Sequence, residues 1–203
     1  MVADFRYVDM TALLDRYIPR PDVRERFETT VRAPAALVME VAAHFDMQSL
    51  PAVKAIFRLR EVLMGSSAGA DRRPQGLLEE TKSLGWGVLG EEPGRYVICG
   101  ATCRPWEADV RFHALPSGTF ADCADPGQVK IAWTLETLAM APDVTQFAQE
   151  TRAVGTDGDS RRRFRRYWRW ARFGIIAIRL LLLPAVRREA ERRWLLETRG
   201  RTL

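Results

Sequence analysis

This sequence of 203 residues is poor in the residues that bind metals and form disulfides. It has two histidines, His44 and His113, and three cysteines, Cys99, Cys103 and Cys123. No CxxC motif or Cys/His cluster occurs, which argues against a zinc site. If Cys99 and Cys103 share a strand, their Cα atoms lie about 13 Å apart, too far for a disulfide. We therefore expect a reduced, cytoplasmic protein that holds no metal and no cofactor.

Signals for export and for nucleotide binding are also missing. The first residues, MVADFRYVDMTALLDRY, show no basic stretch followed by an apolar run, so we expect no secretory signal. The glycines of residues 65–76, GSSAGADRRPQG, match neither a P-loop nor a dinucleotide fingerprint, and this segment is predicted to be a surface loop. No Ser/His/Asp set or paired-carboxylate motif occurs, and His44 is expected to end a helix rather than to catalyse a reaction.

Acidic residues are scarce near the C-terminus. Residues 159–203 carry 14 of the 31 basic residues but only 4 of the 26 acidic ones. Such a segment fits a basic surface for nucleic acid or anionic lipid, and it equally fits the solvated outer side of a long helix. Because one helical face accounts for the arginines and the aromatic residues between them, we favour the solvated helix and expect no nucleic-acid partner.

Period-two and helical patterns together predict an α+β chain. Val23–Val31 alternates as a strand, and Pro34 and Pro51 each stand where a helix can begin. The inward residues expected in the second of these helices are Val53, Ile56, Phe57 and Leu59. Further strands are predicted at residues 84–89, 96–103, 129–136 and 144–154, with an irregular segment or a short strand between 105 and 120.

The longest predicted element is a helix over residues 157–194. Asp157 or Asp159 can cap its start, and Pro184, which lacks an amide hydrogen, is expected to kink or divide it. Its inward stripe is expected to consist of Phe164, Trp168, Ala171, Ile175, Ile178, Leu182 and Ala185, with Arg162, Arg163, Arg166 and Arg169 opposite.

Within this helix, Phe173–Val186 is nearly all apolar and is interrupted only by Arg179. The stretch is too short to span a bilayer. Its flanking arginines suit a helix that lies in a membrane interface. Alternatively, the sheet covers one side of the helix and the N-terminal segment covers the other, since a helix that is apolar nearly all round usually lies in a core. We favour burial, with peripheral membrane contact as the alternative.

Three segments carry a family resemblance: LDRYIPRPDVRERFETTVRAP (14–34), FADCADPGQVKIAW (120–133) and ETRAVGTDGDSRRRFRRYW (150–168). They resemble uncharacterised bacterial members of the START-like superfamily, also called SRPBCC or helix-grip, in its polyketide-cyclase-like branch. The resemblance implies an α+β fold in which a curved antiparallel sheet wraps around the long C-terminal helix, with two short helices after the first strand. It also implies a cavity between the sheet and that helix.

The expected domain organisation follows from these elements. Residues 1–22 form an N-terminal appendage with a short helix at Met10–Tyr17, residues 23–194 form the START-like domain, and residues 195–203 form a tail. The superfamily includes lipid carriers, plant hormone and allergen proteins, polyketide cyclases and aromatases, and Rieske oxygenase domains. This chain has no cysteine and histidine set for an iron–sulfur centre, which excludes the last class.

A cavity of this kind needs apolar walls and a few placed polar groups. The candidate apolar lining consists of Trp86, Tyr96, Trp106 and Trp133 from the sheet region and Trp168, Ile175 and Ile178 from the helix. The alternative is that these side chains fill the core and leave no cavity, because aromatic residues dominate cores. The candidate polar residues are Arg104, Glu150 and Arg152.

Glu150 and Arg152 lie two residues apart on a predicted strand and therefore point to the same side of the sheet. There they can pair with each other or orient a ligand, and a buried pair needs further hydrogen bonds to be stable. The alternative is an exposed pair on the outer side, where polar strand residues usually face water.

We expect the chain to bind a hydrophobic small molecule, such as a lipid, a polyketide or an isoprenoid. One alternative is an enzyme of cyclase or aromatase type, in which Glu150, Arg104 and Tyr96 take part in proton transfer. Another is a module that contacts a membrane or a protein partner through the basic C-terminal helix. The resemblance does not choose among them, because one fold hosts many functions.

Overall fold

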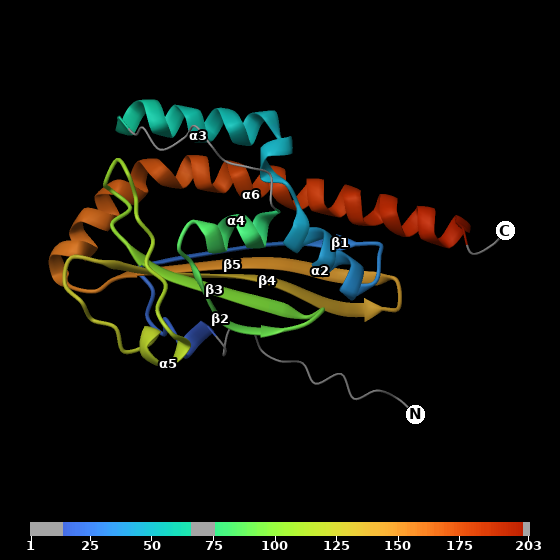
Figure 1. The fold of residues 1–203 in the computed structure, drawn as a ribbon, viewed down its shortest axis with the longest axis horizontal. Coiled ribbons are helices and arrows are strands. Elements are labelled where there is room, and N and C mark those ends of the chain that lie inside the picture. The colour runs from blue at the N-terminus through green and yellow to red at the C-terminus, as the bar shows by residue number, and fades with distance from the viewer. Residues whose placement is uncertain (1–13, 66–75, 201–203) are drawn as a thin grey trace.

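Five antiparallel strands form one sheet in the order β1-β5-β4-β3-β2 (Figure 1). The strands are β1 (Val23–Val31), β2 (Gly87–Glu92), β3 (Tyr96–Cys103), β4 (Val129–Ala141) and β5 (Val144–Gly155). The structure is a computed structural model that describes residues 14–65 and 76–200. The first strand pairs along its whole length with the last, so one edge of the sheet depends on contacts between distant parts of the chain.

Helices lie between β1 and β2, between β3 and β4, and after β5. The helix α2 (Ala35–His44), the 3-10 turn η1 (Met47–Ser49), α3 (Pro51–Met64) and α4 (Leu77–Ser83) follow β1, and α5 (Ser117–Phe120) precedes β4. The last and longest helix is α6 (Gly158–Gly200). In Figure 1, α6 runs along the sheet and α3 lies beyond α6, farther from the strands. This arrangement confirms the predicted α+β helix-grip fold, with two helices directly after the first strand.

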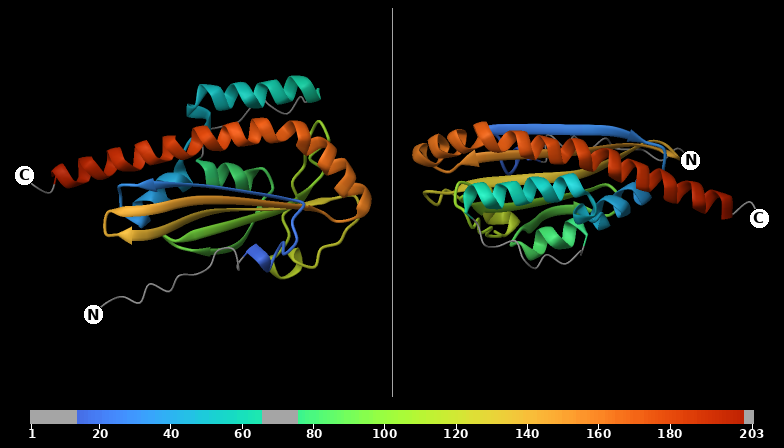
Figure 2. Two further views of the ribbon diagram at one scale, coloured as in Figure 1. Left: turned by 180° about the vertical axis from the view of Figure 1, so that it is seen from behind. Right: turned by 90° about the horizontal axis from the view of Figure 1, so that it is seen from above.

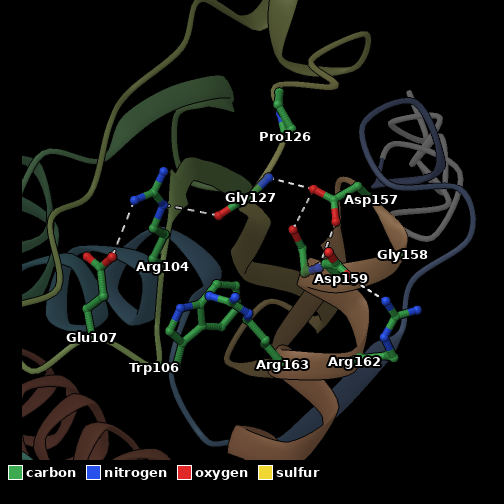
Figure 3. Close-up of a pocket in the computed structure, with 11 residues that line it drawn as sticks. Arg104, Trp106, Glu107, Pro126, Gly127, Asp157, Gly158, Asp159, Arg162 and Arg163 are labelled. Atoms are coloured by element: carbon green, nitrogen blue, oxygen red, sulfur yellow. Dashed lines mark hydrogen bonds and ion pairs between the residues drawn. The ribbon is translucent and has the colours of Figure 1, made fainter.

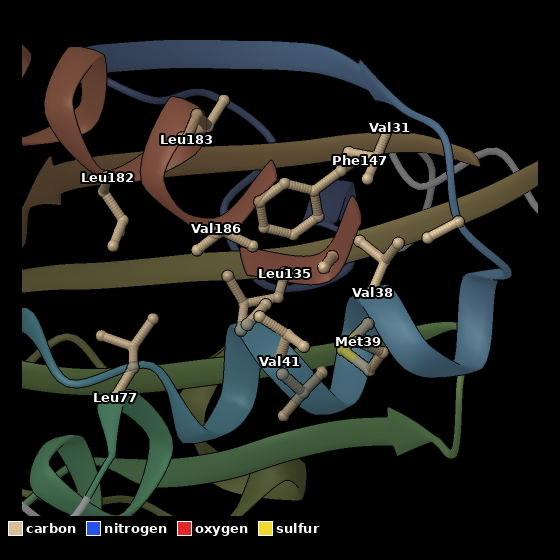
Figure 4. Packing of buried hydrophobic residues seen from close by; sticks show 14 of the residues in the cluster. Val31, Val38, Met39, Val41, Leu77, Leu135, Phe147, Leu182, Leu183 and Val186 are labelled. Carbon is tan, nitrogen blue, oxygen red and sulfur yellow. The ribbon is translucent and has the colours of Figure 1, made fainter. Parts of the chain in front are cut away.

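Strand alternation divides the side chains of the sheet between two sides. On the side turned toward α6, here called the helix-facing side, Trp133, Leu135 and Phe147 pack with Leu182 and Val186 of α6 (Figure 4). Full burial of one such side chain contributes about 1.5–3 kcal/mol. This cluster, which also includes buried residues of α2, therefore fixes the second half of α6 on the sheet.

The opposite side of the sheet, here called the back side, is covered by the N-terminal segment and α5, which lie across the strands from α6 (Figure 2). Leu14, Ile18 and Phe120 are fully buried there against Ile98 and Ala132. The Ile18 amide donates to the Leu14 carbonyl at 2.9 Å, which makes a turn at this point. The predicted helix at residues 10–17 falls mostly outside the described residues.

The predicted and observed elements differ most at α6. The helix continues to Gly200 and runs through Pro184, so the expected end at 194 and a division at Pro184 are wrong. Proline deprives the carbonyl four residues earlier, that of Leu180, of its helical donor. Both Leu180 and Pro184 are exposed, so this carbonyl lies on the outward side of the helix, where water can satisfy it.

Two further differences concern the region between α3 and β2. The helix α4 lies where no helix was expected, and the strand expected from residue 84 begins only at Gly87. Leu59 was expected to face inward, but 59% of its surface is exposed, because α3 packs on α6 rather than on the sheet. The predicted loop at 65–76 lies mostly outside the described residues.

Candidate functional site

A pocket of about 660 Å³ opens at the end of the sheet where α6 begins (Figure 3). Three segments meet there: the chain after β3, the turn before β4 and the first turn of α6. The lining residues are Arg104, Trp106, Glu107, Pro126, Gly127, Asp157, Gly158, Asp159, Ser160, Arg162 and Arg163.

Asp157 fastens the start of α6 to the turn before β4. Its carboxylate accepts hydrogen bonds from the Ser160 amide at 2.7 Å, the Ser160 hydroxyl at 2.8 Å and the Gly127 amide at 2.5 Å. Asp157 is thus the cap of α6, one of the two residues expected in that role. These hydrogen bonds, led by the Ser160 amide, lower the pKa of Asp157 to about 2. Gly127 adopts a positive φ of 79°, which glycine tolerates best.

Arg104 and Trp106, two of the predicted site residues, both line this pocket. Arg104 donates to the Gly127 carbonyl at 3.2 Å and forms a loose ion pair of 3.5 Å with Glu107. Both partners of that pair are about half exposed, and exposed pairs contribute only about 0.2–1 kcal/mol. Arg104 can therefore exchange Glu107 for another anion at little cost, while the half-buried Trp106 supplies an aromatic wall.

The pocket adjoins an apolar cluster beneath the first half of α6. Phe164 of α6 is buried there with residues of β1, β4 and β5, and Trp106 and Trp168 are packed against this cluster. Trp168, Ile175 and Ile178 are all partly buried, which places these three predicted residues along the part of α6 between its two buried contacts with the sheet.

Trp86 and Trp133 lie deeper in the core. Trp133 is buried on the helix-facing side, and its ring meets the Trp86 ring edge-on with centroids 6.4 Å apart. Trp86 in turn contacts Phe112, with ring centroids 4.8 Å apart. These rings therefore pack on one another at this end of the sheet, as expected if the aromatic residues fill the core.

Gln149 is a polar residue on the helix-facing side that the sequence interpretation missed. It lies on β5 between Phe147 and Thr151 and pairs in register with Phe27 of β1. Its side chain is only 1% exposed, and both atoms of its amide lack a hydrogen-bond partner among the described residues. Buried polar groups are almost always satisfied, so this unpaired amide is an exception.

Arg179 approaches the same place from α6. Its guanidinium donates to the Thr151 hydroxyl at 3.3 Å, and burial lowers its pKa to about 10. Gln149 and Thr151 lie two residues apart on one side of the strand, with their Cα atoms about 7 Å apart, so Arg179 contacts the neighbour of Gln149 on that side. Glu25 pairs in register with Thr151, but within the described part of the chain Arg179 forms no ion pair.

Glu150 and Arg152 lie on the back side, together with Tyr96, and not between the sheet and α6. They do share one side of β5, and their side chains pair at 2.7 Å while both are almost fully buried. Glu150 also accepts from Arg24 at 2.9 Å and from Arg26 at 3.3 Å.

The back-side network explains how this buried pair is tolerated. Arg152 also pairs with Asp15 and donates to the Ile18 carbonyl, both in the N-terminal segment. The alternative of an exposed pair is therefore wrong in part: the two residues are on the outer side of the sheet, but the segment 14–22 covers them. A buried pair is stable only with such additional hydrogen bonds.

The ten predicted site residues thus fall into three places. Arg104 and Trp106 line the end pocket. Trp86, Trp133 and Trp168 belong to apolar clusters between the sheet and α6, and Ile175 and Ile178 are partly buried on α6. Tyr96, Glu150 and Arg152 lie on the back side. Gln149 and Thr151 could have been identified from the alternation of β5, which puts both on the same side as the apolar Phe147.

Within residues 14–65 and 76–200, no group of three or more histidine, cysteine, aspartate or glutamate residues is arranged to hold a metal ion. The described helices include none that is both long enough and apolar enough to cross a membrane.

No protein-family model matches this sequence, and no curated protein matches it. Among solved structures, the Zhui aromatase/cyclase from Streptomyces sp. R1128 is similar, with 16% identity over 84% of this chain and 94% of that chain and a TM-score of 0.26. Ara h 8.0201 is similar with 11% identity over 80% of this chain and 98% of that chain and a TM-score of 0.23. At these TM-scores neither similarity bears on function.

Proposed function

We propose that this chain binds a hydrophobic small molecule, such as a lipid, a polyketide or an isoprenoid, between α6 and the helix-facing side of the sheet. The observation that carries the proposal is the Gln149 amide, which is buried and unpaired among apolar side chains. Leaving such a group unsatisfied costs about 1–3 kcal/mol. A ligand oxygen or hydroxyl that bonds this amide would remove that cost, and this couples binding to the stability of the fold.

The ligand has an apolar body and one polar end. Ile175, Ile178 and Trp168 are partly buried along α6 and offer the apolar contacts. Arg179 beside Gln149 offers a cation with no carboxylate paired to it in the described residues, which suits a carbonyl or a carboxylate. A few polar groups in an apolar setting are the usual composition of a small-molecule site.

A cyclase-type reaction that uses Glu150 is not part of this proposal. That carboxylate lies on the back side and accepts hydrogen bonds or ion pairs from three arginines, Arg24, Arg26 and Arg152. The carboxylate is also fully buried beneath residues 14–22, so a substrate held between α6 and the sheet does not reach it.

The test begins with native mass spectrometry of the purified protein, to identify any co-purifying small molecule. Delipidated protein is then titrated with a long-chain fatty acid and with the alcohol of the same chain length. We expect saturable binding of both and tighter binding of the acid, because only the acid presents a carboxylate to Arg179.

Two variants make this test specific. Gln149→Leu removes the amide donor and acceptor and should weaken binding about tenfold, the value of one hydrogen bond of about 1.4 kcal/mol. Gln146→Leu is the matched control, since Gln146 lies on the same strand but on the back side. Absence of saturable binding to any hydrophobic ligand would refute the proposal, and equal affinities of the two variants would remove Gln149 from the site.

A further inference from the structure

The outward side of α6 carries a strip of exposed apolar residues, here called the outer strip: Trp170, Phe173, Leu180 and Leu181. Their exposed fractions are 76%, 63%, 61% and 37%. Phe173 follows Trp170 by three residues, and Leu180 and Leu181 follow Phe173 by seven and eight, which puts all four on one side of the helix. Exposed apolar patches of this kind mark interaction surfaces in soluble proteins.

The described part of the N-terminal segment, residues 14–22, does not cover this strip, contrary to the burial favoured from the sequence. Residues 14–22 lie on the back side of the sheet, against Ile98 and Ala132. The neighbour of α6 on its outer side is α3, and α3 is itself apolar and exposed at Leu59, Val62 and Leu63, with exposed fractions of 59%, 79% and 75%.

The two exposed surfaces adjoin each other. The helices run in opposite directions side by side (Figure 1), and they touch where a Cβ at Gly174 would lie 3.2 Å from Ile56. In an antiparallel pair, residues displaced in the same angular sense from the contact lie on the same flank. Counting 100° per residue, Leu59 and Val62 are turned away from Ile56 in the same sense as Phe173 is turned away from Gly174. All three residues therefore lie on one flank of the helix pair, the flank away from the sheet.

Arginines border the outer strip at its N-terminal end. Arg166, Arg169 and Arg172 are exposed, and none of them forms an ion pair with a described residue. The guanidinium of Arg172 lies over the ring of Phe173, 5.3 Å from its centroid. Exposed aromatic and aliphatic side chains beside unpaired arginines are the composition of a helix that lies on an anionic lipid surface.

We propose that the outer strip, together with the exposed face of α3, docks on the surface of an anionic membrane. Trp170, Phe173 and the α3 leucines enter the interfacial region, while the three arginines contact lipid phosphates and carboxylates. A second copy of the chain is the less suitable occupant, because α6 has no acidic residue between Asp159 and Glu189 and its strip therefore offers no carboxylate to these arginines. The inference does not rest on the proposed ligand, since these exposed residues are not among those that the ligand is proposed to contact.

The test is sedimentation of the full chain with vesicles of phosphatidylcholine alone and with vesicles that also contain phosphatidylserine. We expect binding only to the anionic vesicles and weaker binding as salt increases. Arg166→Gln/Arg169→Gln should weaken binding about thirtyfold, from about 1 kcal/mol per arginine at a lipid surface. Trp170→Ser/Phe173→Ser should weaken it further, because both side chains leave the lipid.

The controls are Arg111→Gln and Met140→Ser, which remove one exposed arginine and one exposed apolar residue outside α3 and α6. Both should bind vesicles as the unchanged protein does. Circular dichroism checks that each variant folds, and the arginine variant tests the surface without touching any buried group. Absence of vesicle binding overturns the proposal. Unchanged binding in both the double arginine variant and the Trp170→Ser/Phe173→Ser variant also overturns it. Sedimentation equilibrium showing a dimer that Phe173→Ser dissociates also overturns it, because the strip then faces a second copy.

Discussion

Replacing Gln149 by leucine should stabilise the protein while weakening its ligand binding. The side chain is 1% exposed, and neither its amide nitrogen nor its amide oxygen has a hydrogen-bond partner among the described residues. Leucine has a similar volume and no polar atoms, so the substitution removes a penalty of about 1–3 kcal/mol without opening a cavity. Taking about 2 kcal/mol as the gain, a domain of this size should melt about 4–8 °C higher.

The measurement is thermal and urea unfolding of delipidated protein, followed by circular dichroism. Gln146→Leu serves as the control, because Gln146 is partly exposed on the back side, where a substitution changes stability by only about 0.5 kcal/mol in either direction. The expected result is a large increase in the unfolding free energy for Gln149→Leu and almost none for Gln146→Leu.

Two outcomes would show the reasoning about Gln149 to be wrong. A loss of stability in Gln149→Leu would mean that the amide is already satisfied in the ligand-free protein. Equal gains in both variants would mean that the effect comes from the general preference of strands for apolar residues and not from the unpaired amide.

Three further predictions concern buried and capping groups. Arg152→Met leaves the Glu150 carboxylate buried without its closest partner, and urea unfolding should show a loss of about 3–5 kcal/mol. Burial raises the pKa of the Cys99 thiol to about 12, so mass spectrometry after brief iodoacetamide treatment at neutral pH should find Cys123, the partly exposed thiol, labelled first. Hydrogen bonds at the start of α6 lower the pKa of Asp157 from 3.8 to about 2. The ionised carboxylate therefore stabilises the fold above pH 3.8, and this stabilisation is lost as the pH falls toward 2. In a series of unfolding curves followed by circular dichroism, Asp157→Asn should make stability less dependent on pH in this range.

Two of these predictions have controls within the same chain. Arg24 also pairs with Glu150 but is about half exposed, so Arg24→Gln should cost no more than about 1 kcal/mol. If it costs as much as Arg152→Met, burial does not set the strength of these pairs. In urea all three cysteines should react, and fast labelling of Cys99 in the native protein would mean that the sheet opens there readily.

The regular elements with clear periodicity were predictable from the sequence. The expected bounds of β1 and β3 coincide with the observed ones, since each strand is delimited by residues that cannot continue its pattern. The long helix was predictable for the same reason, as its apolar residues recur at helical spacing. Its continuation through Pro184 was not, because the cost of the lost hydrogen bond depends on whether water reaches the Leu180 carbonyl.

The placement of side chains in the candidate site was predictable only in part. Alternation alone shows that Glu150 and Arg152 share one side of the sheet. Alternation does not show which side faces α6 or that residues 14–22 cover the other side. Both depend on contacts between residues that are far apart in the sequence. Leu59 belongs to the apolar face of α3, but a helical pattern does not specify whether a neighbouring helix or the exterior meets that face.

The pairing of β1 with β5 has a consequence for synthesis of the protein. The hydrogen-bonding partner of Val31 is Thr145, and Val23 pairs with Ala153, so β1 leaves the ribosome long before its partner exists. At about 5–20 residues per second, the ribosome needs roughly 6–25 s to make the intervening chain. During that time the apolar side chains of β1 and α2 have no sheet to pack on. Docking of α6 comes later still, since the Arg32 amide bonds Glu191, 159 residues away. A nascent chain with such late partners depends on protection from aggregation until its last helix has emerged.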